Sequence, residues 1–128
     1  MLYSFLAIGS GAALGAWLRW GLALWLNPNH STLPLGTLAA NLVGGYGVGL
    51  ALAWIAQQPG LTVEMRLFVI TGLLGGLTTF STFSAETAQL LMRQQYTWAI
   101  GIVAIHVIGS VSMTILGLNT FRLLRGFS

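Results

Sequence analysis

The chain has 128 residues, of which 55% are hydrophobic and 5% charged, with a formal net charge of +3. Water-soluble domains carry about 25% charged residues, so this composition excludes a soluble globular protein. The five basic residues are scattered, which excludes the clustered basic surface of a nucleic-acid-binding protein, and the lack of cysteine excludes disulfides, thiolate metal sites and cysteine nucleophiles. The sequence predicts an integral membrane protein that is surrounded by lipid.

Four apolar segments are long enough to cross a bilayer, which takes about 20 residues. They cover approximately residues 2–26, 35–56, 65–93 and 97–121, with turn-like connections around 27–34, 57–64 and 93–96. We therefore expect an all-α fold, a single four-helix transmembrane domain with both termini on one side of the membrane. The first segment is too long for a secretory signal and lacks a basic start, so we expect it to be retained.

The arginines give little indication of orientation. Arg66, Arg122 and Arg125 would lie on one side of the membrane, and Arg93 and Arg19 on the other. Orientation normally follows such a count, but three against two is a small bias. Either the few charges make the count uninformative, or copies insert both ways and pair antiparallel. Arg19 itself is interpreted as an interfacial residue whose stem lies in lipid and whose head reaches the boundary.

Small residues recur four apart on three of the segments, as Gly11-x-x-x-Gly15, Gly45-x-x-x-Gly49 and Gly72-x-x-x-Gly76. In lipid, such faces let two helix backbones approach closely. They could pack helices within one subunit or between subunits. Four short helices leave little interior for a polar pathway, so the sequence favours an oligomer.

Several polar residues lie inside the apolar segments, where polar groups are costly. Asn41 could join two helices by hydrogen bonding, or it could present its NH₂ group to an anion; the sequence leaves both open. His106, Ser110 and Thr114 recur every four residues and form a polar stripe on one helix face. No second His, Cys or carboxylate lies at ligand spacing from His106, so no side-chain metal site is expected.

The third segment contains an unusual run, GLLGGLTTFSTFSAET at 72–87. Glycine and threonine weaken a membrane helix, so we predict a break from Gly75 to Thr79 whose freed carbonyls would favour a cation. The alternative is an unbroken helix whose hydroxyls bond to carbonyls one turn back.

Phe80 and Phe83 lie three residues apart and would share a helix face. Such spacing often reflects packing, but a phenyl ring has a positive edge. Together with the hydroxyls of Ser81 and Thr82, ring edges would suit a small dehydrated anion. Neutral donors of this kind bind an anion without a fixed positive charge that would trap it.

The chain resembles a known family, the small fluoride channels called Fluc or CrcB. The resemblance covers essentially the whole chain and rests on GAWLRW at 15–20, GTLAANLVGGYGVGL at 36–50 and GLLGGLTTFSTFSAE at 72–86. It implies a dual-topology antiparallel homodimer in the bacterial inner membrane, with two separate fluoride pathways. It also implies passive fluoride export that confers fluoride resistance.

The resemblance assigns roles to individual residues. It implies that Asn41 donates to fluoride, that phenyl rings line the pathway, and that the polar stripe of the fourth segment is a track for the ion. It implies a central structural sodium ion held by main-chain carbonyls of both subunits, mapped here to Gly75 and Thr78. A polar pair near a pore end maps to Glu86 and Thr37.

Three other functions fit the sequence less well. A four-span proton-coupled exporter of toxic cations would need an essential Glu in the first segment, where this chain has Arg19 and no acid before residue 64. A subunit that only supports assembly would explain the glycine faces but not Asn41 or the run at 78–84. An enzyme is not expected, because no nucleophile–base set or cofactor motif is present.

Overall fold

The computed structural model describes residues 1–27 and 34–126. These residues form α1 (Leu2–Leu26), α2 (Leu35–Ala56), α3 (Val63–Arg66), the π-helix η1 (Leu67–Leu74), α4 (Gly75–Leu77), α5 (Phe80–Met92) and α6 (Tyr96–Gly126). Within the described part of the chain there is no strand, which confirms an all-α fold. Most of the predicted connection at 27–34 lies outside the described residues.

Three helical stretches among the described residues are long and apolar enough to cross a membrane: Leu35–Ala56, Val63–Met92 and Tyr96–Gly126. The third of these runs five residues past the predicted end at 121. α1 has 25 residues but does not reach the same mean hydropathy, and it carries Arg19. The structure therefore shows a multi-pass membrane protein whose first helix has the length, but less of the apolar character, of a membrane span.

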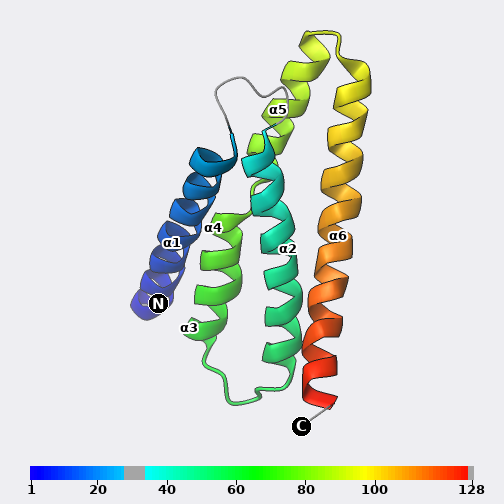
Figure 1. Ribbon diagram of the computed structural model, residues 1–128. Helices are drawn as coiled ribbons and strands as arrows, with labels where there is room; N and C mark the ends of the chain where they lie inside the picture. The colour runs from blue at the N-terminus through cyan, green and yellow to red at the C-terminus, as the bar shows by residue number, and fades with distance from the viewer. Residues whose placement is uncertain (28–33, 127–128) are drawn as a thin grey trace.

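The helices lie in the order α1, α3–α4, α2 and α6 across the molecule, and α5 continues the third segment towards α6 (Figure 1). The first half of the third segment, η1 and α4, packs on α1, whereas its second half, α5, packs on α6. The third segment thus changes neighbours between α4 and α5. This change brings residues of α2, α5 and α6 together at the middle of the molecule.

Glycines determine which helices touch. A Cβ atom added at Gly72 would lie 2.9 Å from the Cα of Gly11, and one added at Gly76 would lie 2.5 Å from the carbonyl oxygen of Ala12. On the other side of the molecule, a Cβ at Gly49 would lie 3.0 Å from the Cα of Gly117 on α6. All three glycine motifs therefore pack helices within one chain. Of the two uses that the sequence left open for these motifs, the structure shows packing within one subunit.

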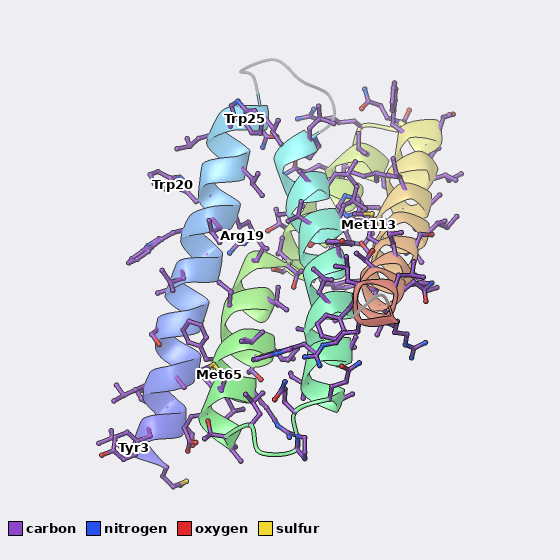
Figure 2. All side chains as sticks on the ribbon, turned by 60° about the horizontal axis from the view of Figure 1, so that its bottom comes forward. Tyr3, Arg19, Trp20, Trp25, Met65 and Met113 are labelled. Atoms are coloured by element: carbon purple, nitrogen blue, oxygen red, sulfur yellow. The ribbon has the colours of Figure 1, made fainter. Side chains whose placement is uncertain are left out.

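Aromatic side chains on the outside of α1 point away from the bundle, as Figure 2 shows for Tyr3 and Trp20. Tyr3 is 75% exposed and Trp25 79% exposed, which suits an apolar surface that faces lipid rather than water. A small buried cluster of Leu90, Ala99 and Ile102 packs α5 against α6 near their connection. Gln94, with a φ of 57°, makes the tight turn of that connection.

Candidate functional site

The third segment is interrupted at Thr78 and Thr79, whose ψ angles of 154° and 117° are those of extended chain. The break is shorter than predicted, since Gly75 and Gly76 remain helical in α4. Gly76 stays helical because its backbone packs directly on Ala12 of α1. α5 then begins with a new cap, in which the side chain of Thr79 accepts a hydrogen bond from the N–H of Thr82 at 3.2 Å.

The break leaves carbonyls without their helical donors, among them those of Gly75 and Thr78. The carbonyl of Gly75 would normally accept from the N–H of Thr79, but that N–H donates to the Oδ1 of Asn41 at 2.8 Å. The carbonyl of Thr78 would accept from the N–H of Thr82, which instead donates to the Thr79 hydroxyl. These two carbonyls belong to the residues to which the family resemblance assigns the sodium ion, and carbonyl oxygens are ligands that hard cations prefer.

Arg19 lies next to this break. Its Nε donates to the carbonyl of Gly76 at 3.2 Å, across 57 residues of sequence. Figure 2 shows the side chain directed from α1 towards the end of α4. The prediction of a snorkelling Arg19 was wrong, because its head bonds to backbone within the bundle. Gly76 loses its own helical donor at the break, so the guanidinium replaces that donor.

Asn41 joins α2 to the break at two points. Its Oδ1 accepts from the N–H of Thr79, and its Nδ2 donates to the carbonyl of the same residue at 3.1 Å. Nδ2 also lies 3.1 Å from the Nδ1 of His106 on α6. Asn41 therefore links three segments of the chain, which is the joining role that the sequence left open.

The aromatic residues form a connected stack. The rings of Phe83 and His106 stack with centroids 4.6 Å apart, and Phe80 meets Phe83 edge-on at 5.6 Å. Phe83 and His106 are buried, but Phe80 is 78% exposed. The prediction that Phe80 and Phe83 share a helix face agrees with this contact.

An open groove of about 350 Å³ runs beside the break between α2, α5 and α6. Uncharged side chains and glycine line it: Asn41, Gly45, Thr78, Thr79, Phe80, Phe83, His106, Val107, Ser110 and Val111. The groove brings together the side chains of five predicted pathway residues, and none of the charged residues in the described ranges lines it.

The remaining predicted pathway residues lie elsewhere. The Thr114 hydroxyl donates to the carbonyls of Gly45 and Ser110, each at 3.0 Å, so it joins α2 to α6. Thr82 accepts from the Thr79 hydroxyl at 3.0 Å, and Ser81 lies 3.3 Å from the same group. These three hydroxyls support the helices around the groove and do not line it.

Glu86 and Thr37 form the pair that the sequence predicted. The Thr37 hydroxyl donates to Oε1 of Glu86 at 2.5 Å, which connects α2 to α5. Thr37 is 6% exposed. The other carboxylate oxygen, Oε2, is buried and bonds to no side chain or backbone group in the described residues. The pair lies one helical turn from Asn41 along α2, on the same face.

Comparisons with known proteins agree with this geometry. Residues 6–118 match the model of a family described as CrcB-like protein, Camphor Resistance (CrcB). The chain belongs to this family.

Individual members are very similar to the chain. It is 58% identical to a protein of Thiobacillus denitrificans, over 95% of this chain and 98% of the relative. It is 60% identical to one of Nitrosospira multiformis, over 94% of each chain. It is 55% identical to one of Pseudomonas putida, over 98% of this chain and 99% of the relative. Each of these relatives carries the name Fluoride-specific ion channel FluC.

Sequence reasoning missed the part that Thr79 plays in this CrcB-like chain. Thr79 contributes its N–H, its carbonyl and its hydroxyl to the site, and only its hydroxyl is visible in the sequence. The π-helix of η1 was also not predicted, and no pattern in residues 67–74 indicates it. Within the described residues, no three His, Asp or Glu side chains gather as a metal site.

Proposed function

We propose that this chain forms a fluoride-selective channel that exports fluoride passively down its electrochemical gradient. The observation that carries the proposal is the groove itself, in which phenyl rings, hydroxyls and the imidazole of His106 meet beside the helix break without any charged side chain. The names of the relatives support fluoride as the ion. These relatives are named as ion channels, and the chain is not an enzyme.

The composition of the groove suits a small anion. Fluoride is compact, so removing its water is costly and short hydrogen bonds must replace that hydration. The Ser110 hydroxyl, the imidazole of His106 and the positive edges of Phe80 and Phe83 provide neutral partners. Chloride is larger and accepts hydrogen bonds less strongly, so the same groups compensate its desolvation less well.

We infer that the functional unit is an antiparallel homodimer with two pathways. The support comes from the exposed side of the site. Phe80 is 78% exposed beside a ring that is buried, and Gly75, whose carbonyl has lost its helical donor, is exposed as well. In lipid, a freed carbonyl must be covered by protein or face a cavity. A second copy placed over this face would cover both groups and close each groove.

The carbonyls of Gly75 and Thr78 fit a structural sodium ion shared by the two copies. Two carbonyls from each chain would supply four oxygen ligands, and the chain offers no competing side-chain site in its described residues. When bound, the cation would offset the partial negative charge of these carbonyls at membrane depth. Arg19 donates a hydrogen bond to the neighbouring carbonyl of Gly76, so we infer that it holds α4 in place beside the sodium site.

We infer dual topology from the small number of charged residues at the ends of the helices, and not from an equal number on the two sides of the membrane. With Arg19 bonded inside the bundle, the ends carry Arg66, Arg122 and Arg125 on one side and Arg93 on the other. We infer that α1 crosses the membrane as the fourth span, because it lies along η1 and α4, which belong to a membrane-length segment. The expected location is the bacterial inner membrane.

The central experiment is ion efflux from liposomes that contain the purified protein. We expect fluoride to leave rapidly and chloride to be retained; equal rates for the two ions would contradict the proposed selectivity. A flux that depends on a pH gradient would instead favour a proton-coupled exporter. Labelling of a terminal tag from each side of the membrane tests the dual topology, for which both sides must be accessible.

Two variants test the aromatic residues. Phe80→Ile and Phe83→Ile remove the ring edge while keeping an apolar side chain, so each should slow or abolish fluoride efflux. The dimer, measured by chemical crosslinking, should remain. Normal efflux from both variants would show that Phe80 and Phe83 pack the helices and do not contact the ion.

A further inference from the structure

The side chain of Thr78, at the helix break, is held between its own helix turn and α2. Its hydroxyl donates to the carbonyl of Leu74 at 2.8 Å, and its backbone N–H donates to the same carbonyl at 3.0 Å. Its methyl carbon, Cγ2, lies against Gly44 of α2, where an added Cβ atom would overlap it. Gly44 is buried, so the Thr78 methyl fills the space that a side chain at this position would take.

Gly44 does not belong to the glycine motif that packs α2 on α6. The neighbouring Gly45 does, since a Cβ atom added there would lie 3.0 Å from the carbonyl oxygen of Ser110. The nearest atoms to a Cβ at Gly44 belong instead to Thr78 and Leu77 of the third segment. Helix packing against α6 therefore explains Gly45, whereas the glycine at position 44 answers to the side chain of Thr78.

The chirality of threonine allows one staggered position that gives both contacts of Thr78. Its Cβ carries a methyl, a hydroxyl and a hydrogen in a fixed order, and rotation about χ1 moves all three together. In the structure the methyl faces Gly44 and the hydroxyl faces the Leu74 carbonyl. If a side chain occupied position 44, only the hydrogen would be small enough to face it. That rotation would carry the hydroxyl away from Leu74 and put the methyl in its place.

Such a rotation cannot leave the backbone of Thr78 where it is. A methyl carbon needs about 3.3 Å from a carbonyl oxygen, whereas the hydroxyl now lies 2.8 Å from the oxygen of Leu74. Thr78 would have to move away from Leu74, and its own carbonyl would move with it. The shape of Gly44 is thus coupled to the position of the Thr78 carbonyl.

The peptide bond between Thr78 and Thr79 is held by the same face of α2. The N–H of Thr79 donates to Oδ1 of Asn41 at 2.8 Å. The C=O of a trans peptide points opposite to its N–H, so the carbonyl of Thr78 points away from Asn41. Asn41 and Gly44 are three residues apart and share a helix face. This face holds the peptide by a hydrogen bond and the Thr78 side chain by its shape.

We propose that Gly44 is a positioning residue that fixes the rotamer of Thr78, so that the break presents the Thr78 carbonyl and keeps the hydroxyl bonded to Leu74. The fixed rotamer stands on the contacts of this chain alone. Its consequence for a cation rests on the proposed sodium site, to which Gly44 contributes no ligand atom. An ion that must first restore the position of Thr78 binds with an affinity reduced by the fraction of molecules in that position.

The rotamer can be measured by NMR of protein with ¹³C-labelled threonine methyl groups in detergent micelles. The Thr78 methyl signal is the one that disappears in Thr78→Ser, and its three-bond couplings to the backbone nitrogen and carbonyl carbon give χ1. We expect one χ1 value in the unmodified protein and a different value, or a mixture, in Gly44→Ala. A mixture in the unmodified protein, or an unchanged χ1 in folded Gly44→Ala, would overturn the proposal.

Thr78→Ser provides a matched rescue, because serine keeps the hydroxyl and lacks Cγ2. The next atoms that a Cβ at Gly44 would meet are Cβ of Thr78 and Cδ2 of Leu77, at 3.6 and 3.7 Å, which is ordinary contact. Gly44→Ala should therefore lower the unfolding temperature in the unmodified background but not in the Thr78→Ser background. If Gly44→Ala does not fold, the double variant should still fold. A double variant that fails in the same way as Gly44→Ala would contradict the methyl contact.

Gly49→Ala is the control for this rescue. Its added Cβ atom meets the backbone of α6 and not Thr78, so Thr78→Ser should leave Gly49→Ala as destabilised as before. If Thr78→Ser rescued both glycine variants equally, its effect would be general, and the specific contact between Gly44 and the Thr78 methyl would be refuted.

The consequence for the cation is measured as the sodium concentration that gives half of the sodium-dependent rise in unfolding temperature. Sodium chloride is exchanged for N-methyl-D-glucamine chloride at constant ionic strength, since an ion that binds only the folded state stabilises it. Gly44→Ala should raise this concentration roughly tenfold, as expected when about a tenth of the molecules hold Thr78 in position. In the Thr78→Ser background, Gly44→Ala should not raise it. Equal values for Gly44→Ala and the unmodified protein would rule out the positioning role.

These measurements separate the present inference from the proposed function. If sodium does not stabilise the unmodified protein, the proposed sodium site fails, while the methyl NMR and the rescue still decide whether Gly44 fixes the rotamer. If sodium stabilises the unmodified protein and Gly44→Ala equally, the sodium site stands and only the role of Gly44 fails.

Discussion

Gly49→Ala should destabilise the protein by closing the space between α2 and α6. A Cβ atom at this position would meet the carbonyl oxygen of Thr114, the nitrogen of Leu118 at 2.8 Å and the Cα of Gly117 at 3.0 Å. All three are backbone atoms, which cannot rotate away, so the two helices must move apart. Forced overpacking of this kind costs about 3 kcal/mol.

The control is Gly9→Ala on α1, where nothing lies within 4 Å of the added Cβ atom. Replacing glycine by alanine inside a helix favours the helix by about 1 kcal/mol, and this gain applies to both variants. Gly9→Ala should therefore be stabilised by about 1 kcal/mol and Gly49→Ala destabilised by about 2 kcal/mol. The difference of about 3 kcal/mol measures the clash alone.

The free energies of unfolding can be measured by reversible unfolding in mixed SDS and detergent micelles, followed by circular dichroism. Fluoride efflux from liposomes gives the functional effect, which should be slower for Gly49→Ala because α2 and α6 form two walls of the groove. Equal unfolding free energies for the two variants would refute the reasoning, since they would show that α2 and α6 are not in backbone contact at Gly49.

Two further variants test the polar contacts. Thr37→Val removes the hydroxyl that donates to Glu86 and should lower the free energy of unfolding by about 1 kcal/mol. The control is Thr87→Val, which should change this free energy little because the Thr87 hydroxyl bonds to the carbonyl of Phe83 in its own helix. Equal effects would mean that the hydroxyl–carboxylate bond contributes nothing. Arg19→Gln shortens the side chain that bonds to the carbonyl of Gly76 and should loosen the end of α4. We expect faster amide hydrogen exchange at residues 77–79 in this variant. Unchanged exchange would show that Arg19 does not hold the end of α4.

Much of the fold follows from composition and hydropathy. Long apolar runs in a chain with so few charges leave the helix as the conformation that satisfies its own backbone in lipid. α1 and α2 coincide with the first two predicted segments for that reason. The helix break could also be predicted, because glycine and threonine weaken a helix locally. Its position could not, since packing of Gly76 on α1 keeps the glycines helical and moves the break to Thr78 and Thr79.

The residue types of the site could be predicted, but only some of their roles. Asn41, Phe83, His106 and Ser110 stand out as polar or aromatic residues in apolar segments, and they do line one groove. Thr114 has the same spacing and type, yet its hydroxyl joins two helices. A pattern of one residue every four gives the helix face, but not whether a hydroxyl is already bonded across the interface.

The sequence by itself determined that this protein is a helical membrane protein of the CrcB-like family and which residues are available for its chemistry, because hydropathy and motif spacing are local properties. The tertiary structure decided how those residues are used. It places all three glycine motifs inside one chain, turns Arg19 onto the carbonyl of Gly76, and commits the amide of Asn41 to Thr79 and His106. Each of these depends on a donor meeting an acceptor, or one backbone meeting another, across at least 38 residues of sequence, and only the folded chain brings them together.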